Sequence, residues 1–387
     1  MAGAETFMSN RVGMATGGIV MSFSQVKASV CAALILAVGA LSARAQENHS
    51  STQPHISVIA STVPANGDVN PYGIARVPQS SGSLHQGSIL VSNFNSRANL
   101  QGTGTTIVQI APNGATSLFA HIDASTLPGP CPGGVGLTTA LAVLRRGWVI
   151  VGSLPTSDGT AATAQAGCLI VLDHHGKVAE TFYGSLINGP WDMTAWDADS
   201  FADLFVTNVL NGSVAARGKV VHQGTVVRLA LDVTYNSAPS LQSITVIGSG
   251  FPERTDPAAL VIGPTGLGLD ASANLLYVAD SLSNRITAIP DPVFRDTSAG
   301  IGATVTQGES LNDPLGLTVA HNGNILTVNG NDGRLVETTP NGDQIHTALL
   351  DSTGNPPGAG ALFGLIDVNG VGIYYVDDAS NTLNLFH

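Results

Sequence analysis

The chain has 387 residues, of which only 11% are charged, and its formal net charge is −12. Because 27 acidic residues outnumber 15 basic ones, we do not expect nucleic acid as a partner. No segment reaches the roughly 20 consecutive apolar residues that a membrane-spanning helix needs, so the sequence predicts no membrane span.

The first 45 residues have the layout of a secretory signal peptide. Lys27 precedes an apolar stretch at 30–41, and the small-residue triplet at 43–45 supplies a cleavage site. We expect Met21 to be the true start, since the segment before it would make the leader unusually long. Cleavage removes three basic residues and one acidic residue, which takes the net charge from −12 to −14. The sequence therefore predicts export to the periplasm or the extracellular space.

Short apolar runs separated by Asp, Asn, Ser and Gly corners follow a short flexible leader at 46–54, and no helical period competes with them. The first run, HISVIAS at 55–61, stands alone. After it, one layout of run, corner and run recurs six times. The copies contain NPYGIARVP (70–78), TTALAVLRRGWVIVGSLPT (138–156), GPWDMTAWDADSFADLFVTNVLNG (189–212), GPTGLGLDASANLLYVADSLSNRITAI (263–289), DPLGLTVAHNGNILTVNGNDGRLVETTPNG (313–342) and LFGLIDVNGVGIYYVDDASNTLNLF (362–386).

One column of mostly small residues aligns the six copies. It contains Gly73, Ala140, Asp192, Gly266, Gly316 and Gly364. A base period near 50 residues, with insertions in the first and third copies, is typical of a radial array of small sheets. The predicted fold is all-β, a single six-bladed β-propeller of four-stranded antiparallel blades over 55–387. Because the last copy ends after three strands, we expect 55–61 to complete it as the outer strand, which leaves no long open edge.

The fourth copy resembles the NHL repeat, whose usual form is Pro-x-Gly-Leu/Ile-Ala-Val-Asp, a Gly-Asn corner, Tyr-Val-Ala-Asp and then Asn-Arg-Ile. The matching residues are Pro264, Gly266, Leu267, Asp270, Asn274, Tyr277, Val278, Ala279, Asp280, Asn284, Arg285 and Ile286. The resemblance is firm over the C-terminal third and looser before it, where Ala140 and Asp192 replace the glycine. It implies a propeller related to metal-dependent lyases, lactonases and esterases.

Two cysteines, Cys131 and Cys168, lie after the signal peptide. In an oxidising compartment a disulfide between them and two free thiols are both open. A disulfide closing a loop of this length would stabilise the fold by about 3–4 kcal/mol. No neighbouring base marks either residue as a catalytic thiol.

A second column follows the second strand of each copy and is rich in Asp and Asn. It contains Asn93, Ser153, Asn208, Asp280, the neighbourhood of Gly330 and Asn331, and Asp378. Such a ring around a channel offers oxygen ligands for Ca²⁺. The same residue types also cap tight corners with their own side chains. We favour the corner role, because the type recurs in nearly every copy.

Asp192 is the one carboxylate in the small-residue column, and Trp191 and Met193 flank it. An acid beside apolar side chains can have a raised pKa and act as a general acid or base, or bind a cation. The alternative is that it points into water or accepts a backbone N–H. A possible Ca²⁺ site combines Asp192 with Asn93, Asn208 and Asp280. No histidine falls in an axial column, so the resemblance brings no histidine metal site.

Two loops that lead into first strands carry the remaining candidate binding residues. They are Glu253, Arg254 and Asp256 in 248–260, and Glu309 and Asp313 in 306–314. Loops on a rigid scaffold are where function concentrates. The favoured hypothesis is a monomeric, exported binding module that contacts a protein or a small-molecule ligand through these loops. The alternative is a Ca²⁺-dependent hydrolase or lyase of a small molecule, of the lactonase or esterase type.

Overall fold

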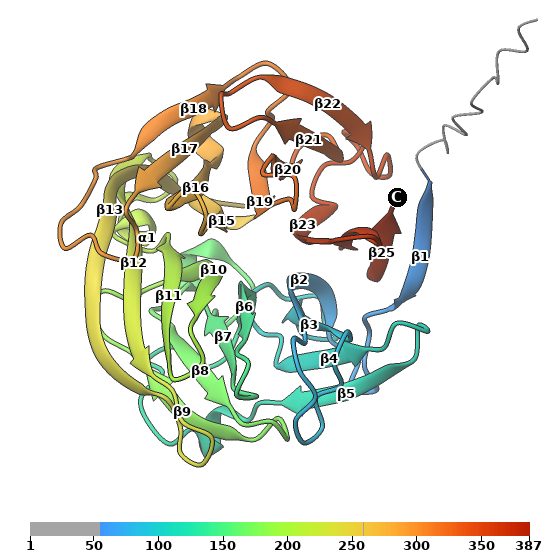
Figure 1. The fold of residues 1–387 in the computed structure, drawn as a ribbon, viewed down its shortest axis with the longest axis vertical. Helices are drawn as coiled ribbons and strands as arrows, with labels where there is room; N and C mark the ends of the chain where they lie inside the picture. Colours follow the sequence, from blue (N-terminus) through green and yellow to red (C-terminus); the bar gives the residue numbers. More distant parts are fainter. Residues whose placement is uncertain (1–54, 258) are drawn as a thin grey trace, which may run out of the picture. The chain divides into compact units, whose positions relative to one another are not determined.

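A computed structural model describes residues 55–257 and 259–387, which form a six-bladed β-propeller (Figure 1). The expected signal peptide and leader, at 1–54, lie outside the described residues. Each blade is an antiparallel sheet that begins next to the axis and continues outward. Five blades have four strands and the third has five, so the predicted fold class is confirmed.

The strands follow the chain from blade to blade. Blade 1 contains β2 (Val69–Arg76), β3 (Ile89–Asn95), β4 (Thr106–Ile110) and β5 (Thr116–His121). Blade 2 contains β6 (Leu137–Val143), β7 (Val149–Ser153), β8 (Cys168–Leu172) and β9 (Val178–Phe182). Blade 3 contains β10 (Pro190–Asp197), β11 (Phe201–Asn208), β12 (Val221–Asp232), β13 (Ser240–Asp256) and β14 (Leu260–Ile262).

The second half of the ring is more regular. Blade 4 contains β15 (Pro264–Asp270), β16 (Leu275–Asp280), β17 (Arg285–Pro290) and β18 (Ala303–Gln307). Blade 5 contains β19 (Pro314–Val319), β20 (Ile325–Asn329), β21 (Arg334–Thr338) and β22 (Gln344–Leu349). Blade 6 contains β23 (Leu362–Val368), β24 (Gly372–Asp377), β25 (Thr382–Phe386) and, from the other end of the chain, β1 (Ile56–Ser61).

The N-terminal strand closes the ring, as predicted. β1 pairs antiparallel with β25, so that Ile56 lies opposite Phe386 and Ser61 opposite Thr382 (Figure 1). This pairing makes the first and last blades neighbours and brings residues from both ends of the sequence to one part of the channel.

The small-residue column lies where the inner strands of adjacent blades approach most closely. A Cβ atom added at Gly316 would lie 1.9 Å from the carbonyl oxygen of Phe363, and one at Gly266 would lie 2.3 Å from that of Leu315. Neither distance is sterically possible. The column is therefore small because the neighbouring backbone occupies the space that a side chain would need.

Hydroxyl groups link some of these inner strands. The Ser92 hydroxyl accepts the N–H of Gly73 (3.0 Å) and donates to the Thr138 carbonyl of the next blade (2.7 Å). In blade 3, the Thr207 hydroxyl accepts the N–H of Asp192 (3.0 Å) and donates to the carbonyl of Thr265 (2.8 Å). These buried bonds satisfy backbone groups that the sheet ladders leave free.

The second column, which is rich in Asp and Asn and is called the corner column below, is misaligned in the last two copies. Asn93 lies opposite Pro71, while Asn329 and Asp377 take the equivalent places opposite Pro314 and Leu362. The alignment near Gly330 and Asn331 and at Asp378 was thus late by at least one residue. The first-strand bulge is the same in the fourth copy, so the difference lies in the hairpin between the paired strands. That hairpin is one residue shorter in the last two copies than in the fourth, where Pro264 lies opposite Asp280.

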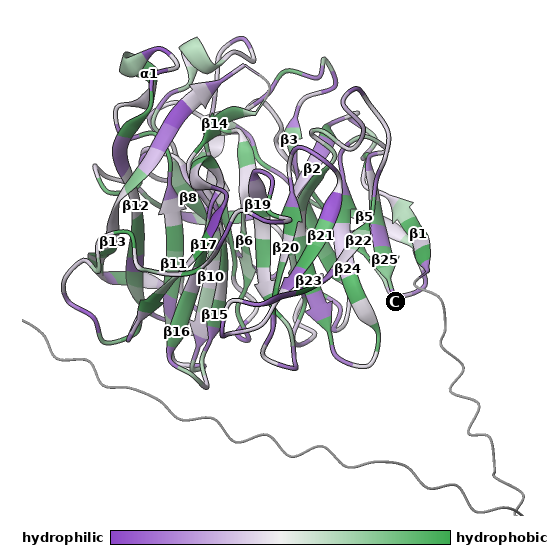
Figure 2. Ribbon diagram, turned by 90° about the horizontal axis from the view of Figure 1, so that it is seen from above, coloured by the Kyte–Doolittle hydropathy of each residue, from purple (hydrophilic) through white to green (hydrophobic). Residues whose placement is uncertain are grey.

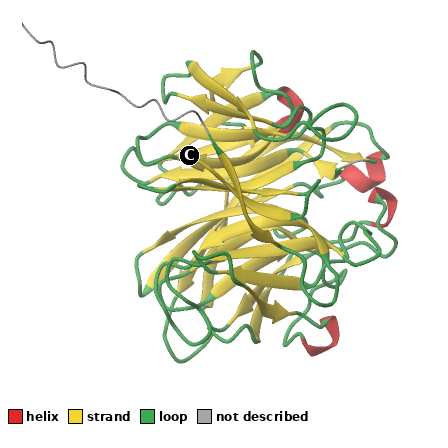
Figure 3. Ribbon diagram, turned by 90° about the vertical axis from the view of Figure 1, so that its right-hand side faces the viewer, coloured by secondary structure: helices red, strands yellow, loops and turns green. Residues whose placement is uncertain are grey.

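The two ends of the propeller differ in their connections. The short helices α1 (Ser213–Ala216), η1 (Ala124–Thr126), η2 (Ala161–Thr163) and η3 (Ser281–Ser283) gather toward one face (Figure 3). Figure 2 shows α1 and β14 at that end. None of the helices within 55–257 and 259–387 is long and apolar enough to span a bilayer. A disulfide joins Cys131, in the loop before β6, to Cys168 at the start of β8.

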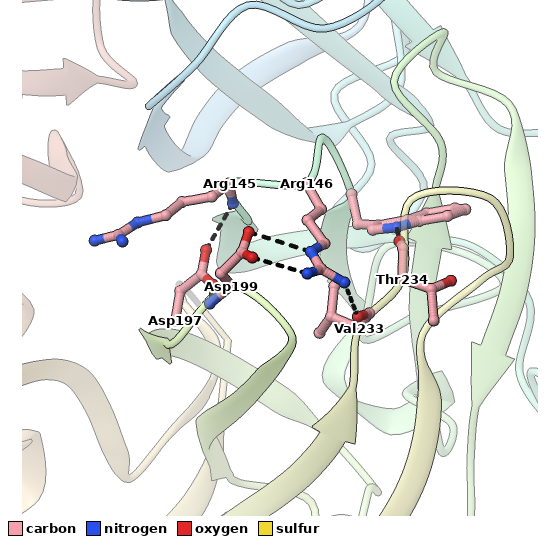
Figure 4. A network of polar contacts seen from close by, with 7 residues as sticks. Arg145, Arg146, Asp197, Asp199, Val233 and Thr234 are labelled. Atoms are coloured by element: carbon pink, nitrogen blue, oxygen red, sulfur yellow. Dashed lines mark hydrogen bonds and ion pairs between the residues drawn. The ribbon is translucent and has the colours of Figure 1, made fainter.

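The opposite end, where the first strands finish, is built from tight hairpins. There the Arg146 guanidinium forms a bidentate pair with Asp199 (3.1 and 2.8 Å) and donates to the Val233 carbonyl (2.6 Å) (Figure 4). The backbone N–H of Arg145 donates to Asp197 (2.6 Å). These contacts tie the hairpin of blade 2 to two hairpins of blade 3.

Candidate functional site

Two hollows occupy the two ends of the channel. The mouth cavity, at the end where first strands begin, has a volume of about 680 Å³ and is lined by residues that include Asn70, Asp313 and Asp378. The basal pocket, toward the hairpin end, has a volume of about 190 Å³, and Asp192 and Met193 are among its lining residues.

An apolar plug separates the two hollows. Leu260 and Val261 of β14 are 2% and 1% exposed, and they belong to one core cluster with Tyr72, Phe94 and Trp191. The space that these five residues enclose together with Thr138, Thr139, Leu154 and Ala259 is only about 10 Å³. The plug comes from the insertion in blade 3, whose fifth strand the sequence did not predict. The long hairpin of β13 and β14 brings Leu260 and Val261 back to the axis of the propeller.

Side-chain amides are the most frequent polar groups in the lining of the mouth cavity. They belong to Asn70, Asn95, Asn99, Gln101, Asn284, Asn312, Asn331 and Asn355. Its charged lining residues are Arg254, Asp256, Asp313 and Asp378, and the rings of Tyr72 and Phe363 contribute apolar surface. Amides both donate and accept hydrogen bonds, so this lining suits a polar, hydroxyl-rich or carbonyl-containing molecule.

Asp378 follows β24 and faces Asn70 of blade 1. With the amide of Asn70 oriented to satisfy its neighbours, its nitrogen donates to Oδ1 of Asp378 (2.8 Å) and its oxygen accepts from Nδ2 of Asn95 (3.1 Å). Burial, followed by the nearby charge of Asp377, raises the pKa of Asp378 to about 7. Near neutral pH this carboxyl is thus present both as an acid and as a base.

Tyr72 lies beside this pair. Its ring stacks between Phe363, at a centroid distance of 3.8 Å, and Phe94, at 4.4 Å. Burial, followed by the charge of Asp378, raises the pKa of Tyr72 far above its usual range. The phenol therefore remains neutral, and the stacked rings hold it in one orientation.

Asp313 is the second acid in the mouth cavity with a raised pKa. Burial, followed by repulsion from Asp256, raises the pKa of Asp313 to about 6, although Arg254 partly offsets the rise. Arg254 itself pairs with Asp256 at 2.8 Å. The cavity therefore contains one guanidinium among three carboxyl groups.

Asn70 and Asp313 share a position that the sequence could have revealed. Each directly precedes the proline that pairs with the corner residue of its blade, and the six residues at this position are Asn70, Gly136, Gly189, Gly263, Asp313 and Ala361. Only two of them are polar. Both have left-handed backbones (φ 63° and 57°), which Asn and Asp tolerate better than other non-glycine residues. Both columns thus reach the mouth cavity, this one through Asn70 and Asp313 and the predicted corner column through Gly330, Asn331 and Asp378.

Of the five residues expected on the binding loops, three line the mouth cavity: Arg254, Asp256 and Asp313. Glu253 is fully buried behind them, and burial raises its pKa to about 8. Glu309 is exposed and lies outside the cavity lining. The sequence analysis considered Asp378 only as a member of the corner column, for which it favoured a structural role, and it did not consider Asn70 or Tyr72.

The four residues considered for Ca²⁺ lie in different surroundings. Nδ2 of Asn93 donates to the Thr62 carbonyl (3.1 Å). Asp280 forms an ion pair with Arg285, and Asn208 is fully buried. Of the four, only Asp192 lines either hollow. Across 55–257 and 259–387, no group of three or more His, Cys, Asp or Glu side chains is arranged to hold a metal.

Asp192 is 8% exposed, and its Oδ2 accepts the N–H of Leu267 in the next blade (2.8 Å). Burial raises the pKa of Asp192 to about 7, against the opposing effect of this hydrogen bond. The carboxyl therefore both links blades 3 and 4 and forms part of the wall of the basal pocket.

No protein-family model matches the chain, and no characterised protein matches it by sequence, so the NHL assignment stays a resemblance. Solved structures share the fold. A gluconolactonase from Xanthomonas campestris aligns with a TM-score of 0.53 and 12% identity over 86% of this chain and 89% of its own. A luciferin-regenerating enzyme aligns with a TM-score of 0.52 and 11% identity over 86% of this chain and 95% of its own.

Proposed function

We propose that this protein is a hydrolase that opens an ester or lactone bond of a small polar molecule in the mouth cavity. The observation that carries the proposal is Asp378, a carboxyl with a pKa near 7 inside an amide-lined cavity of about 680 Å³. An amide lining recognises hydroxyl and carbonyl groups, and a base that titrates near the working pH is the kind that activates water.

The reaction follows from these groups. The ionised carboxylate of Asp378 accepts a proton from a water molecule, whose oxygen attacks the carbonyl carbon of the substrate. N–H donors of the lining, among them Arg254 and the asparagine amides, stabilise the negative charge that forms on the carbonyl oxygen. The bond to the alkoxide leaving group then breaks, and the proton on Asp378 passes to that oxygen.

The lining of this cavity includes carboxylate and amide oxygens, which are the ligand types that Ca²⁺ takes. A bound ion would require the amide of Asn70 to turn over, so that its oxygen in place of its nitrogen faces Asp378. Asp378 and Asn70 would hold the ion, which would polarise the substrate carbonyl. We expect EDTA to lower the melting temperature of the wild type and to leave Asp378→Asn unchanged.

The binding-module hypothesis remains the second candidate, because an amide-rich cavity also suits a polar ligand that undergoes no reaction. The shared fold with a gluconolactonase supports the choice of lactones as first substrates, although fold alone does not determine activity. We further propose that the chain is exported. The signal-peptide layout and the Cys131–Cys168 disulfide support this.

The test is acid release by the exported form, measured by pH-stat titration on a panel of sugar lactones and short-chain esters. We expect turnover of at least one lactone, reduced roughly 10²- to 10⁴-fold in kcat/KM by Asp378→Asn. The exposed Asp296 supplies the control variant Asp296→Asn, which should match the wild type. Saturable binding of a lactone without turnover would support the binding module, and full activity in Asp378→Asn would overturn the proposed mechanism.

A further inference from the structure

The basal pocket is a distinct hollow on the far side of the plug from the mouth cavity. Its aliphatic lining residues include Ile74, Leu141, Leu317 and Leu365. Thr194, Ala195, Thr318 and Ile366 also line it, and they are only half-buried, so the pocket is reachable from the hairpin end of the channel.

Asp192 is the single charged residue that lines this pocket within the described part of the chain. Every other member of its column carries no side chain larger than a methyl group. The carboxyl accepts the N–H of Leu267 and forms no ion pair with any described Lys, Arg or His. A carboxylate in an apolar wall without a cationic partner favours a ligand that brings the missing positive charge.

We propose that the basal pocket is a second ligand site, which binds a small alkylammonium compound through an ion pair with Asp192. The aliphatic wall would contact the alkyl chain, and the carboxylate would contact the ammonium group. A volume of about 190 Å³ lies below the roughly 300–1,000 Å³ of sites for drug-sized molecules, so the ligand is a short-chain amine.

The lining argues against two other classes of ligand. A calcium ion takes six to eight oxygen ligands, and Asp192 is the one carboxylate there, accompanied by the hydroxyl-bearing Thr139, Thr194 and Thr318. An anion would meet the Asp192 carboxylate without any Lys, Arg or His among the lining residues. An organic cation with an apolar body is the class that matches both the charge and the wall.

The test is isothermal titration calorimetry of the exported form with methyl-, propyl- and butylammonium chloride, using n-butanol as the neutral counterpart. We expect one site per chain, with affinity that rises from methyl to butyl and no saturable binding of n-butanol. Asp192→Asn keeps an oxygen that accepts the Leu267 N–H but removes the charge, so it should bind butylammonium at least tenfold more weakly. Asp378→Asn, at the other end, should bind it as the wild type does.

A second variant keeps the test decisive if Asp192→Asn does not fold. Ala195→Leu places a larger side chain at the half-buried edge of the pocket and leaves the carboxyl unchanged, so it should weaken butylammonium binding by a similar factor. Absence of saturable binding by the wild type, or unchanged affinity in the variants that fold, would overturn the proposal. The site is independent of the proposed hydrolase, whose failure would leave this result unaffected.

Discussion

The mouth cavity and the basal pocket lie at opposite ends of one channel, and each contains a carboxyl group whose pKa burial raises to about 7. Their surroundings differ. Asp378 lies among amides, a phenol and a guanidinium, whereas Asp192 lies among aliphatic side chains and three threonines. A raised pKa thus indicates burial in both places, and the neighbouring groups decide what chemistry the carboxyl can take part in.

The connections at the two ends explain this contrast. Long loops and strand beginnings build the mouth cavity, and such segments accept polar residues without disturbing a sheet. The basal pocket lies between inner strands, where adjacent backbones leave room for glycine or alanine. The mouth cavity can therefore hold many polar and charged side chains, whereas the lining of the basal pocket includes one charged residue, Asp192.

The sharpest test of the comparison is the pH dependence of hydrolysis. With a pKa near 7 for Asp378, the ionised fraction rises roughly 100-fold between pH 5 and pH 8. We expect kcat/KM on a lactone to rise by a similar factor over this range in the wild type and in Asp192→Asn. An equally steep rise in the residual activity of Asp378→Asn would assign the titration to another group.

The next largest effect concerns the plug between the hollows. Leu260 is 2% exposed, so Leu260→Ala should lower the free energy of unfolding by about 2–4 kcal/mol through the cavity it leaves. Urea unfolding of the exported form measures the change. Leu118→Ala, at a site 56% exposed, is the matched control and should change stability by less than about 0.5 kcal/mol. Equal effects of the two variants would show that the plug is not tightly packed.

The basal carboxyl should appear in the pH dependence of stability. Because the folded-state pKa of Asp192 is raised from 3.8 to about 7, the folded protein binds more protons than the unfolded chain between these values. Its contribution is complete below about pH 4 and is lost as the pH rises through 7, with a slope of up to about 1.4 kcal/mol per pH unit. Urea unfolding at several pH values should show this slope reduced in Asp192→Asn but not in Asp296→Asn.

The smallest effect is expected at the hairpin contacts of Figure 4. Arg146 pairs with Asp199 on a partly exposed surface and lies 4.5 Å from the ring centroid of Tyr235. Exposed ion pairs contribute little, so Arg146→Ala should lower the melting temperature less than Leu260→Ala does. High salt should reduce the difference between Arg146→Ala and the wild type. A loss as large as that of Leu260→Ala would mean that this contact holds blades 2 and 3 together.

The repeat pattern was sufficient to predict six blades, the small-residue column and closure by residues 55–61. These features depend on short-range patterns that recur in each copy, such as Gly316 before an apolar run and a polar corner after it. The fifth strand of blade 3 was missed, because the 74-residue step between Asp192 and Gly266 shows an insertion but not where its hairpin packs.

The sequence by itself determined the period of the strands, the number of blades and the small-residue column in which Asp192 is the exception. Each of these appears when one copy of the repeat is aligned with the next. Only the tertiary structure decided that Asn70 meets Asp378 and that Leu260 fills the channel. The first pair comes from blades 1 and 6, and ring closure through β1 makes these blades neighbours. Local pattern does not specify such contacts, because they depend on which blades become neighbours and where a long hairpin returns to the axis.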